Sequence, residues 1–210
     1  MTELVLNKRT SGPGMARAAA RRQSGIAMME SLMSMAVLLF GLLGIVGLQA
    51  KTQTSQFEAY QRAQALLLLD DMVSRITANR YAADCYAVTN GAGGQPYLGT
   101  DGAGHRGNTT CTAVTGTAQT RAIAETGMQE WDDLLKGAAE LDASNNEAGA
   151  MIGARGCVSY DVATDSYTVV VTWQGMVPTM APAVDCANGL YGPETQRRAV
   201  STTVRIAHLS

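Results

Sequence analysis

The sequence has few aromatic residues, little charge and no surplus of basic residues. Aromatics make up 5% of the 210 residues, charged residues make up 16%, and the formal net charge is −2. A core built from this composition must depend on Leu, Val, Met and Ala. Nucleic-acid binders concentrate Lys and Arg on a basic surface, so the charge balance argues against a nucleic-acid partner. The 46% hydrophobic content is sufficient for one domain core of ordinary size.

The motifs of metal sites and enzymes are also missing from the sequence. No C-x-x-C motif occurs, and the only histidines are His105, in a glycine-rich stretch, and His208. No phosphate-binding G-x-x-x-x-G-K-[ST] motif is present. Neither histidine stands beside a recognisable nucleophile, so we expect no metal, no cofactor, no catalytic residue and no enzymatic activity.

Two acidic pairs, Asp70-Asp71 and Asp132-Asp133, are the remaining candidates for acid/base chemistry. Both pairs fall in segments that we expect to be helical. Adjacent residues on a helix point in different directions, so two neighbouring carboxylates do not converge on one proton. We therefore predict that both pairs are solvated surface.

Proline is absent between Gly14 and Gln95, so nothing in that stretch breaks a helix. The most hydrophobic run covers residues 26–48 and is long enough to cross a hydrocarbon core about 30 Å thick. We expect a helix of about 54 residues from Ile26 to about Asn79, embedded in a membrane in its first half. Residues 49–80 would form its amphipathic second half, with one apolar stripe. The stripe consists of Phe57, Tyr60, Leu66 or Leu67, Leu69, Val73 and Ile76.

The segment before the apolar run has a different composition. Residues 1–25 carry a net charge of +4, from Lys8, Arg9, Arg17, Arg21 and Arg22 against Glu3. By the positive-inside rule, this charge keeps the N-terminus in the cytoplasm and sends the C-terminal domain outward. No A-x-A type cleavage site follows the run, which argues against a conventional secretory signal. Residues 1–25 are therefore predicted to be a basic leader.

Glu30 is the one charged residue in the apolar run. An ionised carboxylate inside a membrane helix costs about 2.5 to 3.5 kcal/mol on insertion scales, so a solitary one usually implies a partner. Glu30 lies only five residues after Gly25, however, and a side chain so placed can reach the cytoplasmic interface. Spacing alone leaves both interpretations open.

The residues around Gly25 resemble the type III signal of type IV pilins and pseudopilins. That signal has a basic leader, a glycine, an apolar residue at the new N-terminus and Glu at the fifth mature position. Gly25-Ile26-Ala27-Met28-Met29-Glu30 follows this pattern. The continuation, with Gly41-Leu42-Leu43-Gly44 and Gly47-Leu48-Gln49, is similar to the minor pilins known as type IV pilus modification proteins, the PilV family. Weaker similarities lie in Trp173-Gln174-Gly175 and in Arg197-Arg198-Ala199-Val200-Ser201.

The resemblance implies specific processing and pairing at the start of the mature chain. A prepilin peptidase would cleave after Gly25 and methylate the new amine of Ile26, although the family usually has Phe at that position. In the family, the fifth-position carboxylate pairs with the N-terminal amine of a subunit already in the filament, a role that falls here on Glu30. A charged pair costs far less in an apolar setting than either ion alone.

As a whole, the resemblance implies a minor type IV pilin that initiates or modifies pilus assembly. Such a subunit would sit in the bacterial inner membrane with its C-terminal domain in the periplasm, and would enter the pilus. Its partners would be other minor pilins, the major pilin, the prepilin peptidase and the inner-membrane assembly machinery. A type II secretion pseudopilin uses the same signal and is the first alternative. A membrane-anchored periplasmic enzyme or receptor, which would retain residues 1–25, is the second.

Three glycines, Gly41, Gly44 and Gly47, recur at intervals of three residues inside the apolar run. They could form a strip that lets another helix approach closely, or reflect the tolerance of membrane helices for glycine. We favour the packing role. Each glycine also lowers helix propensity by about 1 kcal/mol relative to Ala.

The remaining residues, 81–210, are predicted to form a periplasmic globular α+β domain. Residues 99–108 lack periodicity and are typical of an exposed loop. Residues 118–142 predict a second helix, interrupted at Gly127 and Gly137, with Trp131 as a core anchor. Strands are expected over 157–162, 167–173 and 198–207, with a turn at 163–166. A long N-terminal helix packed on a small antiparallel sheet is an α+β design, and the pilin resemblance implies the same fold.

Four cysteines, Cys85, Cys111, Cys157 and Cys186, permit three disulfide pairings. An exported domain lies in an oxidising compartment, where such bonds persist. We favour sequential pairing of the first with the second and of the third with the fourth, because each bond would then close a loop-rich segment of moderate length. The other two pairings remain possible on this evidence.

Overall fold

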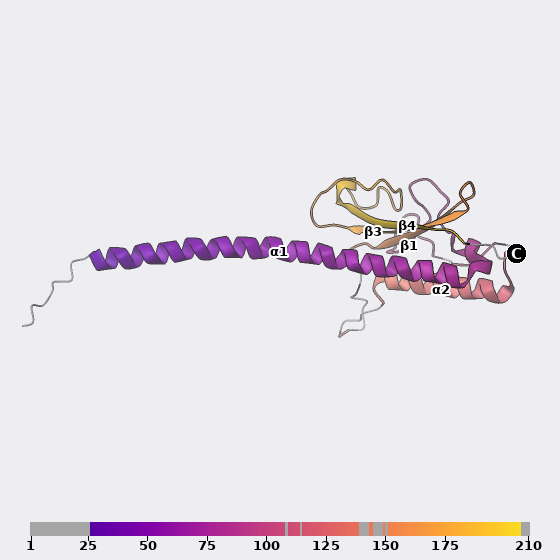
Figure 1. The fold of residues 1–210 in the computed structure, drawn as a ribbon, viewed down its shortest axis with the longest axis horizontal. Coiled ribbons are helices and arrows are strands. Elements are labelled where there is room, and N and C mark those ends of the chain that lie inside the picture. Colours follow the sequence, from indigo (N-terminus) through magenta and orange to yellow (C-terminus); the bar gives the residue numbers. More distant parts are fainter. Residues whose placement is uncertain are drawn as a thin grey trace, which may run out of the picture. The chain divides into compact units, whose positions relative to one another are not determined.

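The fold of the chain is given by a computed structural model (Figure 1). It describes residues 26–107, 109–113, 115–138, 143–144, 149 and 151–206. Residues 1–49 and residues 50–210 form two compact units. Helix α1, Ile26–Ala78, begins in the first unit and ends in the second, in agreement with the predicted helix.

Within the second unit, α1 buries one narrow face. Its buried residues are Gln61, Ala65, Leu69, Met72 and Ile76, at intervals of three and four. The predicted stripe is correct at Leu69 and Ile76, and Val73 is half-buried. Its other members are exposed instead: Phe57, Tyr60, Leu66 and Leu67. Residues 66–69 are four consecutive leucines and point to every side of a helix, so periodicity could not decide which of them faces the core.

Helix α2, Ala118–Lys136, has well-defined signals at both ends. At its start, the Thr117 hydroxyl accepts a hydrogen bond from Thr120 N at 3.2 Å, and Thr117 N donates to the Thr120 hydroxyl at 2.9 Å. This reciprocal arrangement is a capping box. At its end, Gly137 takes the left-handed conformation, with φ 106°, which a side chain would make unfavourable.

The predicted second helix, 118–142, is therefore correct at its start and too long at its end. Residues 139–142 lie outside the described part of the chain. Gly137 does stop the helix, but the predicted interruption at Gly127 is wrong, because Gly127 is buried inside a continuous α2. Its carbonyl accepts a hydrogen bond from Arg75 of α1 at 3.3 Å.

A four-stranded antiparallel sheet covers these helices. Its strands lie in the order β1-β2-β3-β4, with β1 at Leu98–Gly99, β2 at Arg155–Asp161, β3 at Ser166–Gln174 and β4 at Arg197–Val204. The three predicted strands are confirmed with shifts of one to three residues. The two-residue β1 was missed because it lies at the edge of a glycine-rich stretch without periodicity.

The two faces of the sheet have different coverings (Figure 1). Val158, Val169 and Val171 point into the core shared with α1 and α2. Cys157 and Val170, directly opposite one another, belong to a smaller cluster on the other face. The alternation follows the two-residue period of strands. Val162, expected on the apolar side of the predicted strand, is 80% exposed because β2 ends at Asp161.

Trp131 of α2 is fully buried, as the sequence predicted for a core anchor. Its indole Nε1 donates to the backbone carbonyl of Leu68 on α1 at 2.8 Å, which joins the two helices. On the sheet side the indole lies against Gly156 of β2. A Cβ at Gly156 would stand 2.1 Å from the indole ring, so only glycine allows this approach. The close packing of helices and sheet depends on this pair of residues.

A buried arginine, Arg197, holds the long connection between β3 and β4 in place. Arg197 is 2% exposed and pairs with Glu194 at 2.6 Å. Its guanidinium also donates to backbone carbonyls in the connection, including that of Cys186 at 3.2 Å. The neighbouring Arg198 reaches Glu58 of α1 at 3.2 Å. Both arginines of the Arg197-Arg198 pair therefore hold this connection in place.

The Arg197–Glu194 pair generates a prediction about acid stability. Burial opposes ionisation of Glu194, but hydrogen bonds from Gly189 N and Arg197 hold the pKa of its carboxyl below its ordinary value. A carboxyl with a lowered folded-state pKa stabilises the fold above its unfolded pKa, about 4.3, and this stabilisation is lost as pH falls through the folded pKa. We expect Glu194→Gln to lower the free energy of unfolding at pH 7 by about 1–3 kcal/mol.

Denaturant unfolding of the full chain in detergent, between pH 3 and pH 7, would measure this effect, with ~1 pH unit between samples. The difference between wild type and Glu194→Gln should shrink on the acid side. Glu130→Gln is the matched control, since Glu130 is 58% exposed and its bond to Arg75 is a surface pair worth about 0–1 kcal/mol. A pH-independent difference for Glu194→Gln would contradict the assignment.

Candidate functional site

The first 23 residues of α1, residues 26–48, bury no side chain. Every residue there is exposed except Ala36, which is intermediate. Met28, Val37 and Phe40 are 77%, 70% and 75% exposed. By length and composition, α1 is capable of crossing a membrane. Folded proteins rarely leave so continuous an apolar surface in water, so this segment requires a lipid or protein environment.

The charged residues on α1 mark out the membrane-sized part of this segment. Between Glu30 and Lys51 there are 20 residues without a charged side chain. At the rise of an α-helix they extend about 30 Å, which equals the thickness of a bilayer's hydrocarbon core. Both charges would then lie at the two interfaces, where ionised side chains are solvated.

Glu30 lies just over one turn into α1. Its side chain is exposed and forms no hydrogen bond or ion pair with any residue that the structure describes. Ile26, the first residue of α1, is 73% exposed. Gly25 and the leader lie outside the described residues. Cleavage between Gly25 and Ile26, and methylation of Ile26, therefore stay predictions.

The two serines near Glu30 are compatible with an apolar environment. The Ser31 hydroxyl donates to the Ala27 carbonyl and the Ser34 hydroxyl to the Ser31 carbonyl, both at 2.9 Å. A hydroxyl bonded to the backbone of its own helix carries no unsatisfied polar group into lipid. Among Glu30, Ser31 and Ser34, Glu30 is thus the one polar side chain that forms no hydrogen bond with a described residue.

The three glycines of the apolar run are not required by the chain's own packing. A Cβ added at Gly41, Gly44 or Gly47 would meet no atom within 4 Å. All three residues lie inside α1. Each therefore costs helix propensity without gaining a contact within the described chain.

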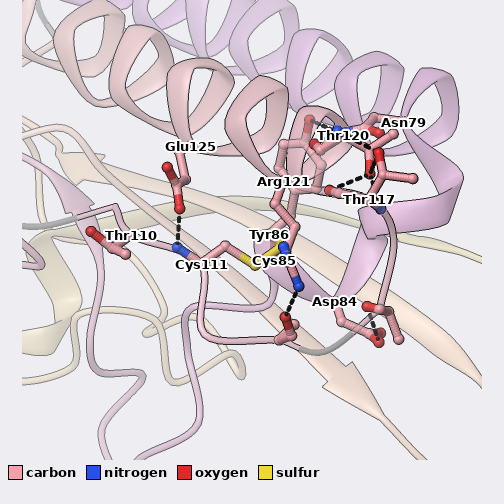
Figure 2. Close-up of a disulfide and its surroundings, with 12 residues drawn as sticks. Asn79, Asp84, Cys85, Tyr86, Thr110, Cys111, Thr117, Thr120, Arg121 and Glu125 are labelled. Atoms are coloured by element: carbon pink, nitrogen blue, oxygen red, sulfur yellow. Dashed lines mark hydrogen bonds between the residues drawn. A yellow bond between two sulfur atoms is a disulfide. The ribbon is translucent and has the colours of Figure 1, made fainter.

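The first disulfide joins Cys85 to Cys111, with Cα atoms 5.1 Å apart. Cys85 belongs to the 3₁₀-helix η1, Arg80–Tyr86, and Cys111 precedes α2. Figure 2 shows how α2 fixes this bond, since Cys111 N donates to the Glu125 carboxylate at 2.7 Å. The bond therefore ties the end of α1, through η1, to α2.

The second disulfide joins Cys157 of β2 to Cys186 in the connection before β4, with Cα atoms 5.8 Å apart. Both sulfur-bearing residues are buried, at 3% exposure each. Together the two bonds are the sequential pairing that we favoured from the sequence. Such bonds are typical of domains in oxidising compartments.

Asp132 corrects the prediction that both acidic pairs are solvated. Its side chain is 4% exposed and accepts hydrogen bonds from Gly99 N at 2.6 Å and Lys136 Nζ at 2.7 Å. His105 Nε2 lies 2.9 Å from the same carboxylate, and His105 Nδ1 lies 3.2 Å from Asp101. This cluster anchors the 99–106 loop to α2, so the loop is less free than expected. The Asp132–Lys136 spacing was the only signal for it in the sequence.

The other three acidic residues of the two pairs are more exposed to solvent than Asp132. Asp70 is exposed, Asp133 is partly exposed, and Asp71 pairs with Arg75 at 2.7 Å. Arg75 also bonds to Glu130 at 2.6 Å, so Asp71 belongs to an ion-pair network. The expected absence of an acid/base dyad remains an expectation.

Arg155 of β2 is a second buried cation that the sequence did not indicate. It is 8% exposed and lies between two aromatic rings, 5.2 Å from the centre of Tyr97 and 5.0 Å from that of Tyr191. It donates to the Gly153 carbonyl at 3.2 Å. Cation–π contacts and carbonyls thus stabilise its charge. The arrangement joins β2 to the segments that carry Tyr97 and Tyr191.

No protein-family model, no curated protein and no solved structure matches this chain.

Proposed function

We propose that this protein is a minor type IV pilin of the PilV kind, a noncatalytic subunit that initiates or modifies pilus assembly. Residues 1–25 are its cytoplasmic leader and residues 26–48 hold it in the inner membrane. The disulfide-bonded domain lies in the periplasm. In this proposal, the same apolar helix that anchors the subunit later packs against other pilins in the filament.

One observation carries the proposal. The apolar first part of α1 is exposed along its whole length and contains a single carboxylate, Glu30, without a partner among the described residues. A simple membrane anchor does not require a carboxylate at this position. In a pilin, this carboxylate would have a partner, because the cleaved N-terminus of a neighbouring subunit supplies a positively charged amine.

The pairing of Glu30 with a neighbour's amine would give assembly its register. Either ion alone is costly in an apolar environment, and the cost falls only when both are brought together. A subunit that slides past the correct position leaves both charges unpaired. The geometry of a single charge on a long apolar helix therefore selects one axial offset between neighbouring helices.

The glycines supply the second element of the proposed packing. Gly41, Gly44 and Gly47 lack side chains at positions where a Cβ would meet no atom of the described chain within 4 Å. Helices approach each other more closely where small residues meet, and in lipid such contacts are a main source of association. This fits a helix that exchanges lipid for pilin neighbours.

The first test concerns processing of the leader. If a prepilin peptidase cuts after Gly25, Gly25→Val should leave a precursor 25 residues longer than the mature protein, because the peptidase requires a small residue at its cut site. Intact mass and N-terminal sequencing of the protein from its native membrane would detect this. A wild-type protein that keeps residues 1–25 would instead favour the membrane-anchored enzyme or receptor.

The second test concerns Glu30. Glu30→Leu should insert into the membrane at least as well as wild type, because it replaces a charged side chain with an apolar one. Cleavage after Gly25 should persist, while incorporation into sheared pili should fall. Ser34→Leu, one turn further along, is the control that adds apolar surface without removing a charge. Equal incorporation of the Glu30→Leu and Ser34→Leu variants would refute the pairing role.

The third test separates helix packing from glycine tolerance. Gly44→Ala should raise local helix propensity by about 1 kcal/mol and should leave the subunit's own fold unchanged, because its Cβ meets open space. If Gly44 contacts a neighbouring pilin, Gly44→Leu should reduce incorporation into sheared pili strongly and Gly44→Ala only slightly. A Gly44→Leu variant that assembles like wild type would leave the glycine without a packing role.

A further inference from the structure

The two edges of the four-stranded sheet differ in how they are covered. One edge is β1, which is only two residues long, and its Gly99 amide donates to the Asp132 carboxylate at 2.6 Å. The other edge is β4, which pairs with β3 over eight consecutive residues without a bulge. No described strand pairs with the far side of β4. The far side of β4 is therefore a long and regular sheet edge.

The hydrogen bonds next to the ladder show which backbone groups of β4 point outward. In an antiparallel ladder, residue pairs that exchange hydrogen bonds alternate with pairs that do not. The Gly175 amide donates to the Gln196 carbonyl at 2.8 Å, in register with the β3–β4 ladder. Counting on in twos, the β4 residues bonded to β3 are Arg198, Val200, Thr202 and Val204. The residues whose N–H and C=O groups point away from β3, called the open edge below, are Ala199, Ser201 and Thr203.

The backbone groups of the open edge have no hydrogen-bond partner in the described part of the chain. A free edge pairs readily with other extended chains, so folded proteins usually protect it with a lysine, a proline or a bulge. Residues 199–204 contain no charged residue, no proline and no glycine, and four of the six are Val or Thr. Such residues favour strand pairing. The open edge therefore lacks the usual protection.

The side chains of β4 are also only half covered. On the face that packs on the helices, Val171 of β3 is fully buried, whereas its direct neighbour across the ladder, Val200 of β4, is half-buried. Val204 is half-buried in the same core. On the opposite face, Ser201 and Thr203 are exposed. A further strand beside β4 would complete the burial of the two valines.

One charged residue lies next to the open edge without a partner. Arg205 comes directly after β4, is exposed, and forms no hydrogen bond or ion pair with the described residues. By contrast, Arg197 pairs with Glu194 and Arg198 pairs with Glu58 at the start of β4. The unpaired charge beside the edge is therefore positive, and a carboxylate on a partner would complement it.

We propose that the open edge binds an extended segment of a partner polypeptide, which adds a strand antiparallel to β4, as in every other ladder of this sheet. A row of alternating N–H and C=O groups is complementary to another extended backbone. The side chains of β4 define the chemistry of the partner. Its apolar residues lie beside Val200 and Val204 on the helix side. Its small polar residues lie beside Ser201 and Thr203, and its carboxylate lies beside Arg205.

A synthetic peptide with this pattern tests the proposal on the full chain in detergent micelles. The probe is acetyl-Asp-Val-Thr-Val-Thr-Val-Thr with a fluorescent label at its C-terminus, and fluorescence anisotropy measures its binding. When its aspartate lies beside Arg205, the threonine amides face the open edge and the valine amides face away. N-methylation of the first two threonines therefore removes two hydrogen bonds. N-methylation of the first two valines removes none and is the matched control.

We expect saturable binding of the unmodified peptide with a Kd between about 10 μM and 1 mM. The methylated threonines should weaken binding at least about tenfold and the methylated valines less than about twofold. Absence of saturable binding would overturn the proposal. Equal weakening by the two methylated peptides would also overturn it, since binding would then not use the backbone of the open edge.

Variants of the protein test the same contact from the other side. Thr203→Pro removes an outward N–H that takes no part in the β3–β4 ladder, and should weaken binding at least about threefold. Thr203→Ala keeps this N–H and is the control. Arg205→Glu should weaken binding of the aspartate peptide and strengthen binding of the same peptide with lysine in that place. Unchanged binding by both Thr203→Pro and Arg205→Glu would contradict the proposal.

Amide hydrogen exchange of the peptide-free chain, measured by NMR, tests whether the edge is open. The amides of Val200 and Thr202 should exchange slowly because they bond to β3, and those of Ser201 and Thr203 should exchange quickly. Added peptide should slow exchange at Ser201 and Thr203. Protection of these two amides without peptide would mean that the chain itself or a second copy covers the edge, and the proposal would be wrong.

Discussion

A single uninterrupted helix has to satisfy two environments, and the other features of the chain follow from this constraint. Beyond the first and last turns, the backbone of α1, Ile26–Ala78, needs no external hydrogen-bond partners, since its amides and carbonyls bond within the helix. Side chains alone then decide what surrounds each turn. Residues 26–48 offer apolar side chains all round, whereas the second half offers one buried face of small and apolar residues. Glu30 is the one charged residue in this first half, and it has no hydrogen-bond or ion-pair partner among the described residues.

The globular unit is organised around the buried face of α1. Trp131 bonds to Leu68 on one side and packs on Gly156 on the other, so that one residue joins α1, α2 and the sheet. The first disulfide holds the segment after the end of α1 to the segment before α2. The Arg198–Glu58 pair joins β4 to α1 near the start of the second unit. The part of α1 that belongs to the second unit is therefore held at both of its ends.

The buried charges hold loops in place. Arg197, Arg155 and Asp132 each gather backbone carbonyls, amides or rings from segments that lack regular structure. A buried ion fixes a loop more specifically than apolar contacts do, because a shifted loop removes the partners of the charge. This explains how long glycine-containing connections are held in place.

The sequence by itself determined the long helix, the strands β2 to β4 and the place of Trp131 in the core, because each depends on local periodicity and on the absence of proline. It also singled out Glu30, since one charge in an apolar run is visible without any fold. Only the tertiary structure decided which of the four leucines at 66–69 faces the core, that Asp132 is buried and that Gly156 must lack a side chain. These outcomes depend on residues far apart in the sequence meeting across layers, such as Asp132 with Gly99 and Gly156 with Trp131, and no local pattern encodes which partners meet.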